Sequence, residues 1–280
     1  MIKITLIQTS QNRREELIRF VCSLNQQQSI NLKEVQLIFV DQGNNRTVFE
    51  ELNKDVVFDY IQTSLCSLSH ARNLALSHVK GFIVAFPDDD CWYPPHTLAC
   101  VLKVIEKEGY DGVSGKGTNE NGILTSIFPK ESSMITPTKR CAAISYTMFF
   151  KYNSEVCFDE NIGVGSPYNL GSGEETDYMI NLIKDFNYRI KYDPQIIVHH
   201  PRSVDNGTGD FVLRKTYCYA RGGGYLMQKH HFPISYYAKQ FLRPIGGIIV
   251  YTLLCRFYNV KKSFLLFKGR TEGFFYKFPQ

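Results

Sequence analysis

The stretch GFIVAFPDDDCWYPP, residues 81–95, decides the fold. Its first half is a short apolar run typical of a strand buried on both faces. That run leads directly into three consecutive aspartates and then into Pro94 and Pro95, which suit the first turn of a helix. Adjacent carboxylates repel one another unless a cation or a set of donors offsets their charge. The sequence therefore predicts a buried strand that ends at an acidic site.

The residues before this stretch alternate between short β-rich runs and helical patterns. Strands are predicted at 2–8, 35–40 and 56–61, and a helix at 69–80. Such alternation is typical of βαβ units around a parallel sheet, in which ligands bind beyond the carboxyl ends of the strands. Asp41 falls just past one of these ends. We therefore expect a ligand site at this edge, beside the three aspartates.

Two interpretations of the three aspartates stay open from the residues alone. Mg²⁺ or Mn²⁺ takes one or two protein carboxylates and completes its shell with water and diphosphate oxygens, so the ligand would be a nucleoside diphosphate. Alternatively, the aspartates form a solvated acidic turn that caps the helix at Pro94. The acidic run by itself supports both equally.

The second half of the chain has a mixed pattern. Short strand-like pieces are predicted at 111–115 and 143–150, a helix from about residue 174, and a strand within 188–201. Asn206, Gly207, Thr208 and Gly209 then predict a joint. We expect a catalytic domain over 1–205, with a nucleotide-binding half (1–109) and an acceptor-binding half (110–205), followed by an extension over 206–280.

The extension differs from the rest in charge and in aromatic content. Residues 211–280 hold twelve Lys or Arg, a single acidic residue and seventeen of the thirty-seven Phe and Tyr, although the whole chain carries only +5. This composition predicts a surface that meets anionic lipid or nucleic acid. Its most apolar run, 245–254, is shorter than the roughly 20 residues that span a bilayer. The run can lie on a membrane or form an ordinary core helix.

Composition excludes several protein classes. Apolar residues make up 44% and charged residues 21%, which is far from the signature of disorder. The eight cysteines form no CxxC pair and no cluster of zinc spacing, so neither a disulfide framework nor structural zinc is expected. A secretory apolar region is missing after Met1, and we expect a reducing cytosol.

Several motifs in order carry a family resemblance over roughly residues 2–201. They are LIFVDQG (37–43), SLSHARNLAL (67–76), the aspartate stretch, FDENIGVG (158–165), GSGEETDYMINLIKDFNYRIKYDP (171–194) and HHP (199–201). In these the chain resembles the inverting glycosyltransferases of family 2. The resemblance implies an α/β GT-A fold, the nucleotide-diphospho-sugar transferase fold, with a Rossmann-like mixed sheet and a C-terminal basic, aromatic helical extension. Residues 214–231 resemble a segment of some bacterial surface-polysaccharide transferases.

The resemblance also implies roles for particular residues. Glu175 would be the catalytic base, or Glu174 if the register differs by one. Nucleotide-binding residues would be Thr9, Asp41, Arg72, Asn73, Asp88 and Asp89, and metal ligands Asp90, Asp88 and His200, with His199 as the substitute for His200. Asp177 and Trp92 would orient the acceptor, although Asp177 is favoured as a helix-capping acid and Trp92 can equally fill the core. His230 and His231 are expected to be bystanders.

The function implied is a metal-dependent inverting transfer of a sugar, of the hexosyltransferase type. A nucleotide-diphosphate donor, UDP-linked above all, would react with a hydroxyl of a glycan or of a polyprenyl-diphosphate-linked acceptor, with Mn²⁺ or Mg²⁺ as cofactor. The setting would be bacterial O-antigen or capsule synthesis, with the protein cytoplasmic and peripheral on the inner face of the membrane. No nucleic-acid module is recognisable, so no nucleic-acid partner is expected.

Two other classes of function compete with this interpretation. A nucleotidyltransferase on a related fold would need a Gly-rich basic loop directly after the first strand, and TSQNRRE (9–15) has no glycine. A non-catalytic carbohydrate- or membrane-binding relative would be expected to have lost some of its carboxylates. The intact DDD and GEETD segments argue against such a loss.

Overall fold

The computed structural model describes residues 1–139, 144–201 and 208–279, in two compact units. We call them the sheet unit (Met1–Cys66, His70–Phe158 and Tyr178–Ser203) and the helical unit (Ser67–Ser69, Asp159–Asp177 and Val204–Gln280). The predicted boundary at 205/206 lies outside the described residues, as do Asn206 and Gly207 of the predicted joint.

The elements begin as βα repeats, continue through a mixed region from β5 to β8 and end in a run of helices. In chain order they are β1 Ile4–Ser10, α1 Arg14–Asn25, β2 Val35–Asp41, β3 Val57–Gln62, α2 Leu68–Leu76, β4 Ile83–Ala85, α3 Thr97–Leu102, β5 Gly112–Thr118, β6 Ser133–Met134, β7 Met148–Lys151, α4 Glu174–Phe186, β8 Ile190–His199, α5 Asp210–Lys229, α6 Ile234–Leu253 and α7 Phe257–Phe274. Short 3₁₀ turns lie at Leu32–Glu34, Arg46–Glu51 and Ser145–Thr147, and a π-helical turn at Lys103–Lys107 follows α3.

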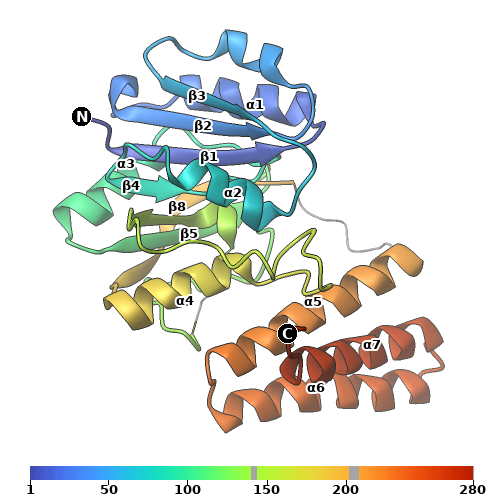
Figure 1. Ribbon diagram of the computed structural model, residues 1–280. Coiled ribbons are helices and arrows are strands. Elements are labelled where there is room, and N and C mark those ends of the chain that lie inside the picture. The colour runs from blue at the N-terminus through green and yellow to red at the C-terminus, as the bar shows by residue number, and fades with distance from the viewer. Residues whose placement is uncertain (140–143, 202–207, 280) are drawn as a thin grey trace. The chain divides into compact units, whose positions relative to one another are not determined.

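The eight strands form one mixed sheet in the order β3-β2-β1-β4-β7-β5-β8-β6. β3, β2, β1 and β4 are parallel neighbours, as Figure 1 shows. Their register brings Ser10, Asp41 and Gln62 to the same carboxyl edge. The predicted α/β class and the Rossmann-like mixed sheet are confirmed.

β7 interrupts the parallel order. It runs antiparallel to both β4 and β5, with Phe150 opposite Val84 on one side and Gly112 on the other. The strand-like piece predicted at 143–150 begins as a strand only at Met148, because Ser145–Thr147 form a 3₁₀ turn. This turn presents Ser145 and Tyr146 to the acidic stretch after β4 (see below).

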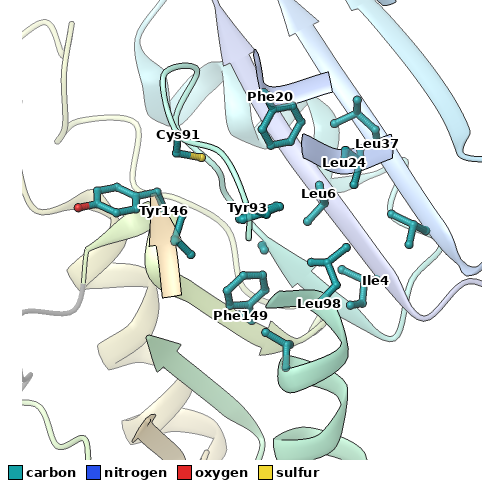
Figure 2. Close-up of a cluster of buried hydrophobic side chains, with 14 of the residues drawn as sticks. Ile4, Leu6, Phe20, Leu24, Leu37, Cys91, Tyr93, Leu98, Tyr146 and Phe149 are labelled. Carbon is teal, nitrogen blue, oxygen red and sulfur yellow. The ribbon is translucent and has the colours of Figure 1, made fainter. Parts of the chain in front are cut away.

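Apolar side chains from β1, β2, β4, α1 and α3 meet in one of the buried clusters of the sheet unit. Figure 2 shows part of it, where Phe20 of α1 lies near Leu6 of β1 and Tyr93, the latter in the segment that follows the aspartates. The rings of Phe20 and Tyr93 pack edge to face at 5.7 Å. Each fully buried side chain of this size contributes about 1.5–3 kcal/mol. Burial of Cys91 and Tyr93 therefore anchors the far end of the acidic stretch.

The predicted helical extension consists of α5, α6 and α7, which lie side by side in Figure 1. Glycines allow the close approach of α5 and α7. A Cβ at Gly273 would clash with the carbonyl of Arg221, and one at Gly224 with the carbonyl of Arg270. Within the described residues, no helix has both the length and the apolar character needed to cross a bilayer.

Candidate active site

The three aspartates after β4 turn toward different partners. Asp88 accepts a hydrogen bond from the Ser145 hydroxyl at 2.9 Å and lies 3.4 Å from the guanidinium of Arg72. Asp89 accepts one from the Ser10 hydroxyl at 2.7 Å. Asp90 lies between Arg13 (2.6 Å) and His200 (2.8 Å). Their charges are therefore offset by donors from four separate segments, which fix the stretch at the carboxyl edge of the sheet.

The acidity of these groups differs because their surroundings differ. Burial, reinforced by the charges of Asp90 and Asp88, raises the pKa of Asp89 to about 6, although Ser10 and Arg13 act against it. Burial alone would also raise the pKa of Asp90. There His200 and Arg13 outweigh burial and hold the pKa below its usual value. Of Asp89 and Asp90, Asp90 is therefore the carboxylate held more firmly in its ionised form.

His200 is fixed in a definite orientation. Its ring stacks on Tyr146, with centroids 4.5 Å apart, and its Nδ1 donates to the carbonyl of Pro201 at 2.7 Å. A histidine held in this way presents its other nitrogen, Nε2, as a ligand or hydrogen-bonding group. Here Nε2 points at Asp90. His199 points elsewhere, with its Nδ1 on the Thr118 hydroxyl at 2.9 Å. The geometry favours His200 over His199 as a metal ligand.

The pair formed by Asp90 and His200 suits a divalent ion bound together with diphosphate. One carboxylate oxygen and one imidazole nitrogen converge there, and Mg²⁺ or Mn²⁺ typically takes few protein ligands when phosphates supply the rest. Over the described ranges 1–139, 144–201 and 208–279, no three His, Cys, Asp or Glu side chains come together as a complete metal site. The residues therefore fit a metal whose shell is finished by a ligand.

Asp41 organises the loop after β2. Its buried carboxylate accepts hydrogen bonds from the Tyr60 hydroxyl (2.6 Å) and from the backbone N–H groups of Gly43 (2.8 Å) and Asn45 (2.6 Å). Burial alone would raise the pKa of Asp41, but these bonds outweigh it and lower the pKa. The side-chain amide of Asn45 is a fourth donor, at 2.8 Å, so a nucleobase could contact this carboxylate only in exchange for one of these donors.

The other predicted nucleotide-binding residues lie in different surroundings. Arg72 is almost fully buried, and its guanidinium lies over the rings of Phe86 and Phe158 as well as beside Asp88. The amide of Asn73 exchanges two hydrogen bonds with the backbone of Phe158, at 2.8 and 2.9 Å, so it fixes that segment. Thr9 is half-buried near the end of β1.

Trp92 contacts residues from two other segments of the sheet unit. Its backbone forms a two-way antiparallel bridge with His199, and the guanidinium of Arg19 lies 3.9 Å from its ring centroid. Arg19 also donates to the carbonyl of Asp90 at 3.0 Å. These contacts tie the aspartate stretch to β8 and to α1.

The predicted catalytic carboxylates occupy the first turn of α4 and belong to the helical unit. Glu174 is only 4% exposed, with its carboxylate against Gly163. Glu175 is half-buried, and its Oε2 has no hydrogen-bond partner among the described residues. Asp177 is fully buried and accepts hydrogen bonds from His230 at 2.8 Å and from Lys229 at 3.0 Å. His230, expected to be a bystander, therefore contacts one of the predicted site residues.

Sequence reasoning missed three residues whose side chains contact the aspartate side chains, namely Ser10, Arg13 and Ser145. It also missed Tyr146, which stacks on His200. Ser10 and Arg13 could have been found, because Ser10 ends β1 beside Asp41 and Arg13 follows shortly after it at the same carboxyl edge. The sequence holds no signal for Ser145 and Tyr146, because the pattern of their segment predicts a strand. Its 3₁₀ turn depends on contacts with residues distant in the sequence.

A mixed sheet with an acidic, donor-lined carboxyl edge fits the GT-A fold of nucleotide-sugar transferases. The chain belongs to family 2 of the glycosyltransferases, since the family described as "Glycosyl transferase family 2" matches residues 5–167. It is a glycosyltransferase. No curated protein matches the sequence significantly.

Solved structures with similar folds include TarS of S. aureus and a mannosyltransferase of Pyrobaculum calidifontis. TarS 1–349 in complex with UDP-GlcNAc has a TM-score of 0.60 and 16% identity, over 99% of this chain and 94% of that one. The mannosyltransferase PcManGT, in complex with GDP-Man and Mn²⁺, has a TM-score of 0.60 and 14% identity, over 98% and 87%. A longer TarS structure has a TM-score of 0.60 and 15% identity over 97% of this chain, which spans only 55% of it.

Proposed function

We propose that the protein is a metal-dependent inverting glycosyltransferase that builds a bacterial surface polysaccharide such as O-antigen or capsule. The observation that carries this proposal is the pairing of Asp90 with an oriented His200 at the carboxyl edge of β4. That edge is where nucleotides bind in open α/β sheets.

The residues around the aspartates would bind the sugar-nucleotide donor. Asp90 and His200 would hold Mn²⁺ or Mg²⁺, and Asp88 and Asp89, with Thr9, Asp41, Arg72 and Asn73, would bind the nucleotide directly or through the loops they order. A bound divalent ion neutralises charge on a departing diphosphate. A UDP-sugar is the donor we propose, since one of the similar folds holds UDP-GlcNAc; another holds GDP-Man, so both bases need testing.

The general base of the reaction is proposed to be Glu175. An inverting transfer is a direct displacement at the anomeric carbon, and it needs one carboxylate to deprotonate the acceptor hydroxyl. Glu175 Oε2 lacks a hydrogen-bond partner among the described residues, so it can accept a proton without first breaking a bond. Glu174 is more deeply buried and remains the substitute. Asp177 and Trp92 would act by orienting neighbouring groups.

A donor screen tests this function. The full chain is incubated with a panel of UDP- and GDP-linked hexoses, with Mn²⁺ and with EDTA, and free nucleotide is measured. We expect release from one sugar class that requires the metal. Release of pyrophosphate in the presence of a nucleoside triphosphate and a sugar phosphate, without any use of sugar nucleotides, would instead indicate a nucleotidyltransferase.

The acceptor is proposed to be a glycan or a polyprenyl-diphosphate-linked saccharide at the inner face of the cell membrane, which places the enzyme in the cytoplasm. Two rows on the helical unit support a membrane-facing surface. Along α6, exposed apolar side chains recur at spacings of three and four, namely Ile234, Ala238, Leu242, Ile245, Ile249 and Leu253. Along α7, exposed phenylalanines alternate with exposed lysines at the same spacings, namely Phe257, Lys261, Phe264 and Lys268. Apolar rings and aliphatic groups beside lysines suit an anionic lipid interface.

Leu253→Asp should weaken binding to anionic vesicles at least about tenfold. The variant removes a 79% exposed leucine and adds a negative charge, each of which costs about 1 kcal/mol or more at such a surface. Vesicle sedimentation at low salt measures it, with Ile127→Asp as the control, because Ile127 is 91% exposed in the sheet unit. Equal sedimentation of the two variants would contradict the assignment of this surface.

A further inference from the structure

The segment that carries the proposed base rests on α5. Just before the base, Gly171 N–H donates to the carbonyl of Cys218 at 3.0 Å, and the hydroxyl of Ser172 donates to the carbonyl of Tyr219 at 2.9 Å. Gly222 has no side chain, and a Cβ there would clash with the backbone of Ser172. The loop over residues 171–173 thus lies directly on the backbone of α5.

A second attachment follows just after the base. Lys229 bridges two acidic side chains, at 2.7 Å from Asp159 and 3.0 Å from Asp177, and His230 donates from Nε2 to Asp177 at 2.8 Å. Asp177 and His230 are both buried. Charged groups out of water hold their geometry tightly, because losing a partner leaves an uncompensated charge. This cluster therefore fixes the first turn of α4 to the end of α5.

We propose that residues 218–230 form a support that positions Glu175 for catalysis, with Gly222, Lys229 and His230 as positioning residues. The inference rests on the proposed role of Glu175 as the base. Glu174 and Glu175 lie between the two attachments, Ser172 on one side and Asp177 on the other. A general base must stay within hydrogen-bond reach of the acceptor hydroxyl, and displacements near 1 Å can cost about 10²-fold in rate. The extension is then part of the catalytic apparatus as well as a membrane-facing element.

His230→Ala should lower kcat about 10-fold or more while the KM for the donor stays within about twofold, because the donor site belongs to other residues. His230→Gln places an amide N–H near the position of Nε2 and should restore most of the kcat. His231→Asn is the matched control, since His231 is exposed and has a positive φ of 49° that asparagine tolerates. It should behave as wild type.

Three neighbouring glycines give an independent test without touching the charged cluster. Gly222→Ala pushes a methyl group against Ser172 and should reproduce the loss of kcat. Gly223→Ala meets nothing within 4 Å and should be neutral. Gly224→Ala presses on the backbone of α7 instead, so it should lower the melting temperature without selectively lowering the kcat of the folded enzyme.

Hydrogen exchange provides a readout that needs no activity. In His230→Ala and Gly222→Ala, amides of residues 172–177 should exchange faster than in wild type and in Gly223→Ala. Faster exchange together with an unchanged kcat would overturn the positioning role, and so would a kcat loss in His230→Ala that Gln does not rescue. Failure of the proposed role of Glu175 looks different, because Glu175→Gln would then keep normal turnover whether or not the support is intact. Failure of the proposed transferase function would appear as absence of nucleotide release in the wild type.

Discussion

The Asp90→Ala variant should lose transfer activity and also lose metal-dependent donor binding. Asp90 contacts His200 at 2.8 Å, and its pKa is held low by His200 and Arg13 in spite of burial. Without it, His200 alone would hold the metal, and the charge developing on the departing diphosphate would lose several kcal/mol of stabilisation. Turnover, followed as nucleotide release, should fall at least about 10³-fold.

The fold should survive this change. Arg13, one of the two side chains that contact the Asp90 carboxylate, is half exposed, so water can replace the lost contact. Far-ultraviolet circular dichroism and thermal melting check this point. Asp185→Ala removes an exposed carboxylate from α4 and serves as the control that keeps activity. An active Asp90→Ala enzyme would refute the assignment of the metal site.

Glu175→Gln should keep donor affinity while turnover drops by at least about 10²-fold, the usual contribution of a positioned general base. Glutamine preserves the shape of the side chain but cannot take up the acceptor proton. Single-turnover measurement with saturating donor separates the chemical step from binding. The loss should appear in that step alone.

Glu174→Gln is the matched comparison, one residue earlier in the same turn. Because Glu174 is almost fully buried, its replacement should affect stability more than the chemical step. Near-normal turnover in Glu175→Gln, combined with a large loss in Glu174→Gln, would move the base by one position.

The parallel part of the sheet was predictable because its signals are local. Buried strands, polar ends and helical spacing all lie within windows of a few residues, and β1, β2, β3 and β4 form close to the predicted positions. The insertion of β7 between β4 and β5 was not predictable. It depends on pairing between Val84 and Phe150, which no local pattern records.

The candidate site also has a part that the sequence predicts and a part that it does not. The aspartates and Asp41 could be placed because the carboxyl ends of parallel strands meet at one edge. The stacking of Tyr146 on His200 and the contact between Asp177 and His230 could not, since each joins side chains more than fifty residues apart. The resemblance named one member of each pair, His200 and Asp177. Only the structure supplies the partner that orients it.

Calorimetric titration tests the central claim most directly, which is that the edge carrying Asp90 and His200 binds a nucleoside diphosphate together with a divalent ion. UDP and GDP are titrated separately into the wild-type chain and into Asp90→Ala, with Mn²⁺ and with EDTA. We predict that one nucleotide binds the wild type with a single site, at least about tenfold more tightly with Mn²⁺ than with EDTA, and that Asp90→Ala abolishes this difference. Equal affinity of that nucleotide for both proteins, with Mn²⁺ and with EDTA, would contradict the claim, and so would no binding of either nucleotide.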